Sequence, residues 1–369
     1  MQPTVFEFDS RRSMVLARRG MVAASNPLAA QAGLDVLKRG GNAADAAIAT
    51  AAVLNVTAPA STGIGGDCFA LYYDAATGQV SALNGSGRAP AALTIDTVRA
   101  QGHATMPLRS ALAVTVPGAV RGWSDLLARH GRLTLGDVLT DAIYYAREGY
   151  PVSPVFGTAW NSAATVELLE SSRYAGDYLP DHKPPQVGQI VRLPGLANSL
   201  QAIAEGGAEA FYTGPIADAI VRTLAEYGGV MTHNDLAAHV STWDTPIATN
   251  YRDVTVIECP PNGQGLAALL ALNIAEGFDL AALPWDSPER LHLMIESMRL
   301  AFADARHYIA DPAVQPVPIG GLLDKNYAAQ RRAMISPDRA MTPPTFGAPL
   351  PSSNTVYLSV IDGEGNACS

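Results

Sequence analysis

The chain has 369 residues, of which 48% are hydrophobic and 16% are charged, and its formal net charge is −9. This composition excludes a disordered chain and describes a folded protein with a large core, in one large or two modest domains. The negative charge argues against a nucleic-acid partner, which needs a clustered basic surface. The longest apolar runs, such as 43–56, are interrupted by Asp45, so no membrane span is expected.

The first 19 residues carry charges and lack the apolar core of a secretory signal. A cytoplasmic location is therefore the default expectation, and a missing leader would make it periplasmic. The three cysteines, Cys68, Cys259 and Cys368, include no CxxC pair, which argues against a disulfide framework or a zinc knuckle. The histidines show no metal-binding spacing, and the glycine loop 63–66 lacks the third glycine of a dinucleotide fingerprint. We therefore expect no metal and no cofactor.

Local signals predict the first elements in order. Asn26-Pro27 begins a helix that Gly40-Gly41 ends. A second, alanine-rich helix over 42–56 has small residues on every face, which suits a helix packed tightly against neighbours. After the glycine-dense loop 61–67, alternating residues over 69–84 predict a β-hairpin.

Further along, residues 117–230 are expected to be mostly helical, with loops at 150–156 and 180–195. A strand over 254–258 meets a second glycine loop, 260–265, which opens a helix over 266–274. The clearest helix begins at 287 and has apolar residues at helical spacing: Leu291, Met294, Ile295, Met298, Phe302, Ala305, Tyr308 and Ile309. Helices and strands mix without strict βαβ alternation, which indicates a layered α/β or α+β domain.

Thr355 is a candidate nucleophile because of the sequence on either side of it. Residues 336–353 hold five prolines and little periodicity, so they are expected to form a surface loop or a mobile segment. Asn354-Thr355 follows, and then a strand pattern. If the chain were cut before Thr355, that residue would carry a hydroxyl nucleophile and an α-amine base together. A threonine that begins a strand is also commonly structural, so the residue pattern alone leaves both interpretations open.

Several motifs resemble the γ-glutamyltranspeptidase family, and the resemblance extends over residues 20–369. The signature Gly-Gly-Asn-Ala-x-Asp-Ala, which begins at Gly40, is specific to it. Residues 355–366 look like the start of that family's small subunit. The other matching segments are Met21–Ala29, the glycine loop 63–66, Arg88–Ala92, Val116–Gly118 and the segment from Ala301 to Pro312.

This resemblance implies an α+β fold, the four-layer αββα sandwich of N-terminal-nucleophile hydrolases. It implies a zymogen in which residues 1–354 form the large-subunit region, with 336–353 as the processing linker, and 355–369 begin the small catalytic subunit. Autocatalytic cleavage between Asn354 and Thr355 would free Thr355 to attack γ-glutamyl amides such as glutathione. The acyl group would pass to water or to an amine acceptor, so the family is both a hydrolase and a γ-glutamyltransferase. The new small subunit would remain the partner of the large one.

Departures from the family pattern leave the substrate open. Alignment on Arg88 places Ser86 where the family has an arginine that holds the substrate α-carboxylate. If this segment is a strand, both residues share a face, and Arg88 could bind a carboxylate from a shifted position. It could equally be an exposed residue at a strand end. The family commonly has Thr-Thr-His where this chain has Thr355-Val356-Tyr357, which favours the branch that includes cephalosporin acylases and oxamate amidohydrolases.

Only fourteen residues follow Thr355, whereas the family's catalytic half continues well beyond the nucleophile and supplies the oxyanion glycines. We therefore expect the chain as it stands to be truncated, inactive alone, and left with unpaired strand edges. The alternative outside the enzyme class is a non-catalytic fragment that keeps a small-anion pocket, built from the glycine loops and Arg88.

Overall fold

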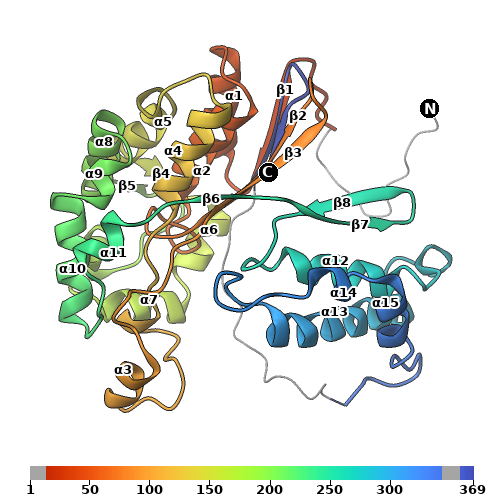
Figure 1. Ribbon diagram of the computed structural model, residues 1–369. Helices are drawn as coiled ribbons and strands as arrows, with labels where there is room; N and C mark the ends of the chain where they lie inside the picture. Colours follow the sequence, from red (N-terminus) through yellow and green to blue (C-terminus); the bar gives the residue numbers. More distant parts are fainter. Residues whose placement is uncertain (1–13, 343–357) are drawn as a thin grey trace.

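A computed structural model describes residues 14–342 and 358–369. Its central feature is an antiparallel sheet with helices packed on one face (Figure 1). Segments far apart in the sequence are neighbours in this sheet, because β1 pairs with β9 from Gly20↔Asp362 to Ala24↔Leu358. In spatial order the strands are β1 (Gly20–Ala24), β9 (Leu358–Asp362), β10 (Ala367–Cys368), β2 (Cys68–Asp74), β3 (Gln79–Gly85) and β6 (Thr242–Asp244).

Three helices pack directly on the sheet. These are α1 (Pro27–Lys38) against β1, α2 (Ala43–Thr57) against β9 and β10, and α4 (Ala119–His130) against β2 and β3. Behind them, α5 (Leu135–Glu148) packs on α2, and α8 (Pro194–Gly206) packs on α5. The main hydrophobic core therefore lies between the sheet and α2, and it continues outward to α8.

Helix α2 confirms the prediction made from its composition. Fourteen of its fifteen residues are buried, because alanines on every face let neighbouring elements approach closely. At Gly33 on α1, a Cβ would lie 2.3 Å from Thr50 Oγ1 of α2, so the two helices meet at backbone distance. Asn26 caps α1 with its side-chain oxygen, as its position before Pro27 predicted, and Asn42 caps α2 in the same way.

The predicted helical region 117–230 is confirmed, but its two predicted loops are partly wrong. A short antiparallel strand pair occupies part of both loops, α6 begins inside the first, and α8 begins inside the second. The remaining elements of the body are α3 (Ile95–Ala100), η1 (Ala111–Ala113), β4 (Tyr150–Pro151), α6 (Pro154–Trp160), α7 (Ala163–Glu170), η2 (Ala175–Tyr178), η3 (Pro180–His182), β5 (Ile190–Val191), α9 (Glu209–Tyr212), α10 (Pro215–Glu226) and α11 (His233–Ala237).

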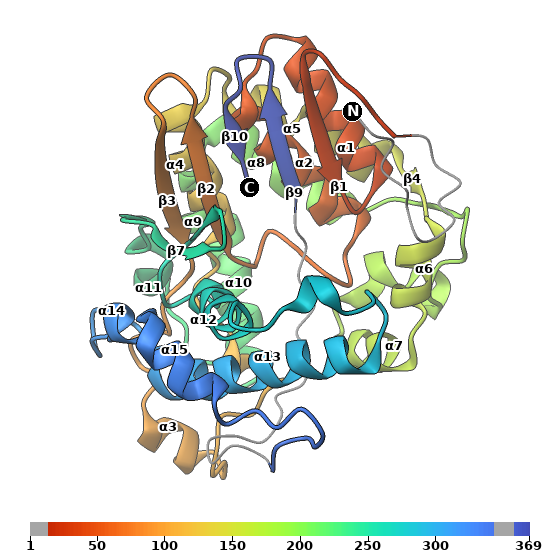
Figure 2. The ribbon, with the colours of Figure 1, turned by 90° about the vertical axis from the view of Figure 1, so that its right-hand side faces the viewer.

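A second group of elements lies below the sheet in Figure 2 and has core clusters of its own. It confirms the predicted strand over 254–258 and both predicted helices. The group consists of the hairpin β7 (Ile247–Tyr251) and β8 (Val254–Glu258), followed by α12 (Gly265–Ala275), η4 (Leu280–Ala282), α13 (Pro288–Tyr308), α14 (Ile319–Leu322) and α15 (Lys325–Arg332).

Two apolar surfaces remain exposed. The first half of the apolar stripe on α13 faces outward, with exposed fractions of 47% for Leu291, 57% for Ile295 and 41% for Met298. On the sheet, Phe69 and Tyr73 of β2 are 38% and 40% exposed, whereas the alternate residues contact the helices. The helical spacing thus predicted helix α13 correctly, but it did not predict that part of its apolar face is exposed.

The mixed α+β class is confirmed. A complete four-layer αββα sandwich stays a prediction, because outside the main sheet the described residues form only two-stranded sheets. Among the same residues, no helix is both long and apolar enough to span a membrane.

Candidate functional site

The predicted nucleophile and scissile bond, Thr355 and Asn354–Thr355, lie outside the described residues. The description resumes at Leu358, where β9 begins and pairs with Ala24 of β1. On its other side β9 pairs with β10. The strand predicted to follow Thr355 is therefore present from Leu358 onward, and it is an interior strand of the main sheet.

The two other predicted site residues lie in a turn after β3. Because β3 ends at Gly85, the alternation argument that put Ser86 and Arg88 on one face of a strand does not apply to them. Ser86 is half-buried, and its Oγ donates to Asn84 Oδ1 at 2.7 Å. Asn262 Nδ2 donates to the same Oγ at 3.0 Å. Ser86 is thus held by two amide side chains and carries no charge for a carboxylate.

Backbone packing fixes the middle of this turn. A Cβ on Gly87 would lie 1.4 Å from the carbonyl oxygen of Val116, so only glycine fits there. Val116 N in turn donates to Arg88 O at 2.9 Å, and Gly87 N donates to Asp67 Oδ1 at 3.2 Å. Desolvation raises the pKa of the Asp67 carboxyl, and the bond from Gly87 opposes that shift. The turn is therefore clamped between the glycine loop and the 116–118 segment.

Arg88 itself is exposed, and among the described residues no side chain forms an ion pair or hydrogen bond with its guanidinium. Its charge nevertheless affects the pKa of a buried side chain. Desolvation lowers the pKa of the buried His239, and Arg121 and Arg88 lower it further. Arg88 is thus a cation that remains available to a ligand.

The glycine loop 63–66 does not form an anion cradle with helix α4. The first amides of that helix region, Gly118 N and Ala119 N, both donate to Gly66 O at 2.9 Å. Because a carbonyl already occupies these donors, they are not available to an anion. The start of α4 therefore adds no free amide to a small-anion pocket at this loop, and Arg88 is the cation predicted for such a pocket.

The cysteines nearby are poor nucleophiles. Desolvation raises the pKa of Cys68 and of Cys259 to about 12, so neither is a thiolate near neutral pH. Within residues 14–342 and 358–369, no group of three or more His, Cys, Asp or Glu side chains is placed to hold a metal ion.

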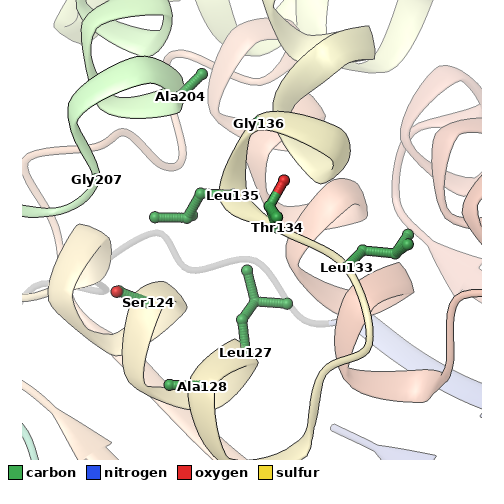
Figure 3. A pocket seen from close by; sticks show the side chains of 9 residues that line it. All are labelled: Ser124, Leu127, Ala128, Leu133, Thr134, Leu135, Gly136, Ala204 and Gly207. Atoms are coloured by element: carbon green, nitrogen blue, oxygen red, sulfur yellow. The ribbon is translucent and has the colours of Figure 1, made fainter.

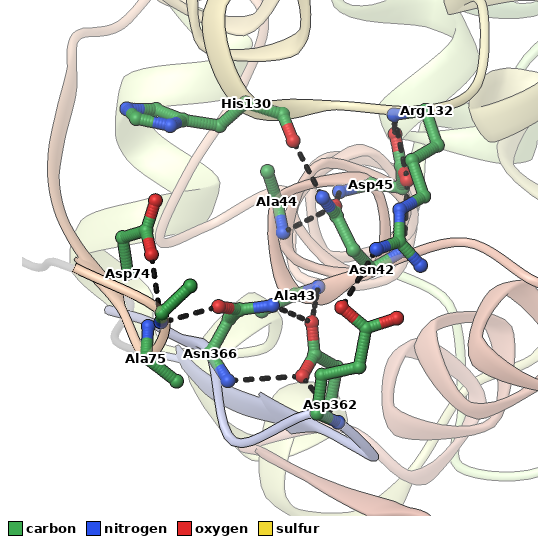
Figure 4. A network of polar contacts seen from close by, with 12 residues as sticks. Asn42, Ala43, Ala44, Asp45, Asp74, Ala75, His130, Arg132, Asp362 and Asn366 are labelled. Atoms are coloured by element: carbon green, nitrogen blue, oxygen red, sulfur yellow. Dashed lines mark hydrogen bonds and ion pairs between the residues drawn. The ribbon is translucent and has the colours of Figure 1, made fainter.

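A buried polar network at the opposite end of β9 was missed by the sequence analysis (Figure 4). Asp362 Oδ2 accepts from Ala43 N at the start of α2 at 3.2 Å and from Asn366 Nδ2 at 2.8 Å. Asn366 Oδ1 accepts from Ala75 N at 3.0 Å, at the β2–β3 turn. This network joins residues 358–369 to the body. The sequence signal available for it was the turn-forming Asp362-Gly-Glu-Gly-Asn366 pattern.

The same network extends to the family signature. Asp45 is fully buried, and its carboxylate accepts from Asn42 N at 2.8 Å and from Arg132 N at 3.0 Å. The Arg132 side chain then pairs with Glu364 Oε2 at 2.7 Å. The Asn and Asp of the signature therefore organise the start of α2 and the loop before α5.

Two hollows mark the described surface. One, of about 360 Å³, lies between α4, the start of α5 and the end of α8 (Figure 3), and hydroxyls of Ser124 and Thr134 are the polar side chains in its lining. The other, of about 500 Å³, begins at Ala89 beside Arg88 and is largely apolar. Its lining includes Leu93, Ile95, Val98 and Met106.

Comparison with known proteins places these features in a family. A family model described as gamma-glutamyltranspeptidase matches residues 29–369. The glutathione hydrolase-like YwrD proenzyme of Bacillus subtilis (strain 168) is 40% identical over 96% of this chain and 66% of that protein. The acylase ACY 1 proenzyme of Pseudomonas sp. (strain V22) is 34% identical over 100% of this chain and 67% of that protein.

Among solved structures, the cephalosporin acylase of Bacillus halodurans has a TM-score of 0.88 and is 43% identical over 100% of this chain and 68% of that chain. The chain thus spans about two thirds of the length of these relatives.

Proposed function

The chain belongs to the γ-glutamyltranspeptidase family, and on that premise we propose that it is part of an autoprocessing amidohydrolase or acyltransferase with Thr355 as nucleophile. The observation that carries the proposal is the position of β9. The strand that follows Thr355 is hydrogen-bonded on both sides within the main sheet. A nucleophile attached to an interior strand is attached to one of the more rigid elements of the fold.

In the proposed mechanism Thr355 is the nucleophile twice, first in cleavage of its own chain and then in cleavage of the substrate amide. In processing, Thr355 Oγ attacks the Asn354 carbonyl carbon, the peptide C–N bond breaks, and water hydrolyses the resulting ester. The freed α-amine has a reference pKa of about 7.7–8.0, so it is a base near neutral pH. In turnover, the same hydroxyl attacks a substrate amide, releases the amine and forms an acyl-enzyme. Water or an acceptor amine then takes the acyl group.

Arg88 supports γ-glutamyl amides of the glutathione type as the leading substrates, because their acyl group carries an α-carboxylate. Its guanidinium has no ion-pair partner among the described residues and stands on a turn whose backbone is clamped. Several relatives are glutathione hydrolase proenzymes by name. Arg88 would then supply the charge that Ser86 lacks.

An acylase of the cephalosporin type is the second candidate, and an oxamate-type amidohydrolase is a third. The hollow that begins at Ala89 supports the acylase, because most of its exposed lining is apolar and suits an uncharged acyl group; Arg99 and His103 are polar members of that lining. Relatives named as acylases match the whole chain. A non-catalytic fragment with an anion pocket is the remaining alternative.

The uncovered apolar surfaces support a role for further polypeptide. The outward face of β2 and the stripe on α13 leave Phe69, Tyr73 and Ile295 in solvent, and contiguous apolar patches of this kind usually mark an interface. The longer relatives carry about another third of chain. We propose that the corresponding polypeptide, which after cleavage would be the rest of the small subunit, packs on these surfaces and completes the site.

Intact mass of the full-length gene product tests this function. We expect a large fragment that ends at Asn354, and we expect Thr355→Ala to abolish both cleavage and amide hydrolysis. An unaltered protein that stays uncut during long incubation would refute autoprocessing.

Specificity is tested with γ-glutamyl and simple acyl amides. Arg88→Gln should raise KM for the γ-glutamyl amide by about tenfold or more, since a charge-assisted contact is worth about 1.5–3 kcal/mol. Arg222→Gln, at an exposed arginine on α10, is the matched control. Faster turnover of the simple acyl amide by the unaltered enzyme, with no effect of Arg88→Gln, would favour the acylase.

A further inference from the structure

We infer that Asn262 is a positioning residue, which holds the Ser86–Arg88 turn from the loop that precedes α12 and so sets where the Arg88 guanidinium meets substrate. This inference rests on the proposed role of Arg88. The sequence of the second glycine loop, 260–265, predicts only the start of a helix. In the structure its asparagine reaches across to a different part of the fold.

The contacts of Asn262 use both ends of its amide. Its Oδ1 accepts from Asn84 Nδ2 at 2.9 Å, and its Nδ2 donates to Ser86 Oγ at 3.0 Å. Ser86 Oγ donates to Asn84 Oδ1 at 2.7 Å, which closes a ring of three side chains. A side-chain amide supplies a neutral donor and an acceptor from one planar group. Aspartate would lose the donor, and alanine would lose both.

The loop that carries Asn262 is itself seated on the sheet. Cys259 Sγ donates to Ala70 O of β2 at 3.8 Å. At Gly263, a Cβ would lie 3.5 Å from the Phe69 ring, which is ordinary contact distance. Asn262 therefore approaches the turn from an element that already rests on the neighbouring strand.

The turn depends on this contact at its outer side. On the inner side, Gly87 rests against Val116, as described above. The outer side faces solvent, and there the amides of Asn84 and Asn262 hold Ser86. Because the Arg88 side chain has no partner among the described residues, its position follows that of its backbone. Loosening the turn should therefore weaken carboxylate binding without touching the nucleophile.

Kinetics of the full-length enzyme test this. Asn262→Ala should raise KM for γ-glutamyl amides by about tenfold, which corresponds to about 1.4 kcal/mol and matches the loss of one or two hydrogen bonds. Both kcat and the kinetics of simple acyl amides should change less than twofold. Asn262→Asp, which keeps the acceptor, should fall between. The matched control is Asn326→Ala, at an exposed asparagine of the same group.

Hydrogen exchange separates this inference from the proposed function. Ser86 N bonds Asn84 Oδ1 and Gly87 N bonds Asp67 Oδ1, so both amides report on the turn. They should exchange at least fivefold faster in Asn262→Ala than in Asn326→Ala, with α2 unchanged. If Arg88→Gln has no effect on KM, the role of Arg88 fails, yet faster exchange would still support Asn262 as the clamp. Unchanged exchange, or an equal loss of kcat with both substrates, would overturn the inference.

Discussion

Replacing Asp362 by alanine should destabilise the protein more than most single substitutions, because this carboxylate joins residues 358–369 to the body. It is 6% exposed and accepts from Ala43 N, Glu364 N, Asn366 N and Asn366 Nδ2, at 2.8 to 3.2 Å. The variant removes the acceptor of three buried donors, which are Ala43 N at the start of α2, Asn366 N and Asn366 Nδ2. Each such donor costs about 1–3 kcal/mol, so we expect a total loss of about 3–5 kcal/mol.

Urea unfolding followed by circular dichroism at neutral pH measures this loss. The control is Glu364→Gln, two residues away in the same turn, whose side chain is 60% exposed and pairs with Arg132 at the surface. The control should leave the unfolding midpoint unchanged. If Asp362→Ala unfolds within about 1 kcal/mol of the unaltered protein, the network in Figure 4 does not hold the β9–β10 hairpin and the reasoning fails.

Three further predictions follow from packing and charge. Gly87→Ala should cost at least about 1–3 kcal/mol, because its Cβ would overlap a carbonyl oxygen, whereas Gly65→Ala enters open space; equal melting temperatures would contradict this. Desolvation, and then Arg129, lower the pKa of His130, so the unfolded chain binds more protons below about pH 6.5 and stability should fall as pH drops. His130→Gln should reduce that fall between pH 7 and 5.5, and an unaltered pH dependence of the urea midpoint would be evidence against it. In the 369-residue chain without further polypeptide, Ile295→Lys should leave the midpoint within about 0.5 kcal/mol and reduce self-association in light scattering, since this side chain is 57% exposed; marked unfolding would show that the stripe is buried.

Short sequence signals were sufficient to predict the helices and strands whose ends or periodicity depend on neighbouring residues in the chain. The Asn26-Pro27 start and the Gly40-Gly41 stop placed α1, the alanine-rich run placed α2, and alternation placed the β2–β3 hairpin. Strand β1 was not predicted, because Gly20–Ala24 has no alternation and becomes a strand only by pairing with β9. The exposed half of α13 could not be anticipated either, since spacing identifies an apolar face without showing what covers it.

The residues of the candidate site also separate into those that local sequence could predict and those that it could not. Ser86 and Arg88 were predicted as site residues because they border a recognisable motif, and the strand considered for them ends at Gly85, before either residue. Asn262 and Asp362 were missed because their partners lie far along the chain: Asn262 contacts Asn84, and Asp362 contacts Ala43. Contacts of this kind depend on how the sheet and helices assemble, and no local window of sequence contains them.

The interior position of β9 also determines how late during synthesis the main sheet can form. Strand β1 cannot pair until residues 358–362 exist, and at about 5–20 residues per second the ribosome needs roughly 20–70 s to reach them. Throughout that interval the edges of β1 and β2 are open to strands of other nascent chains. Closing so non-local a sheet is also intrinsically slow. We therefore expect newly made chains to need chaperones until β9 and β10 enter the gap between β1 and β2.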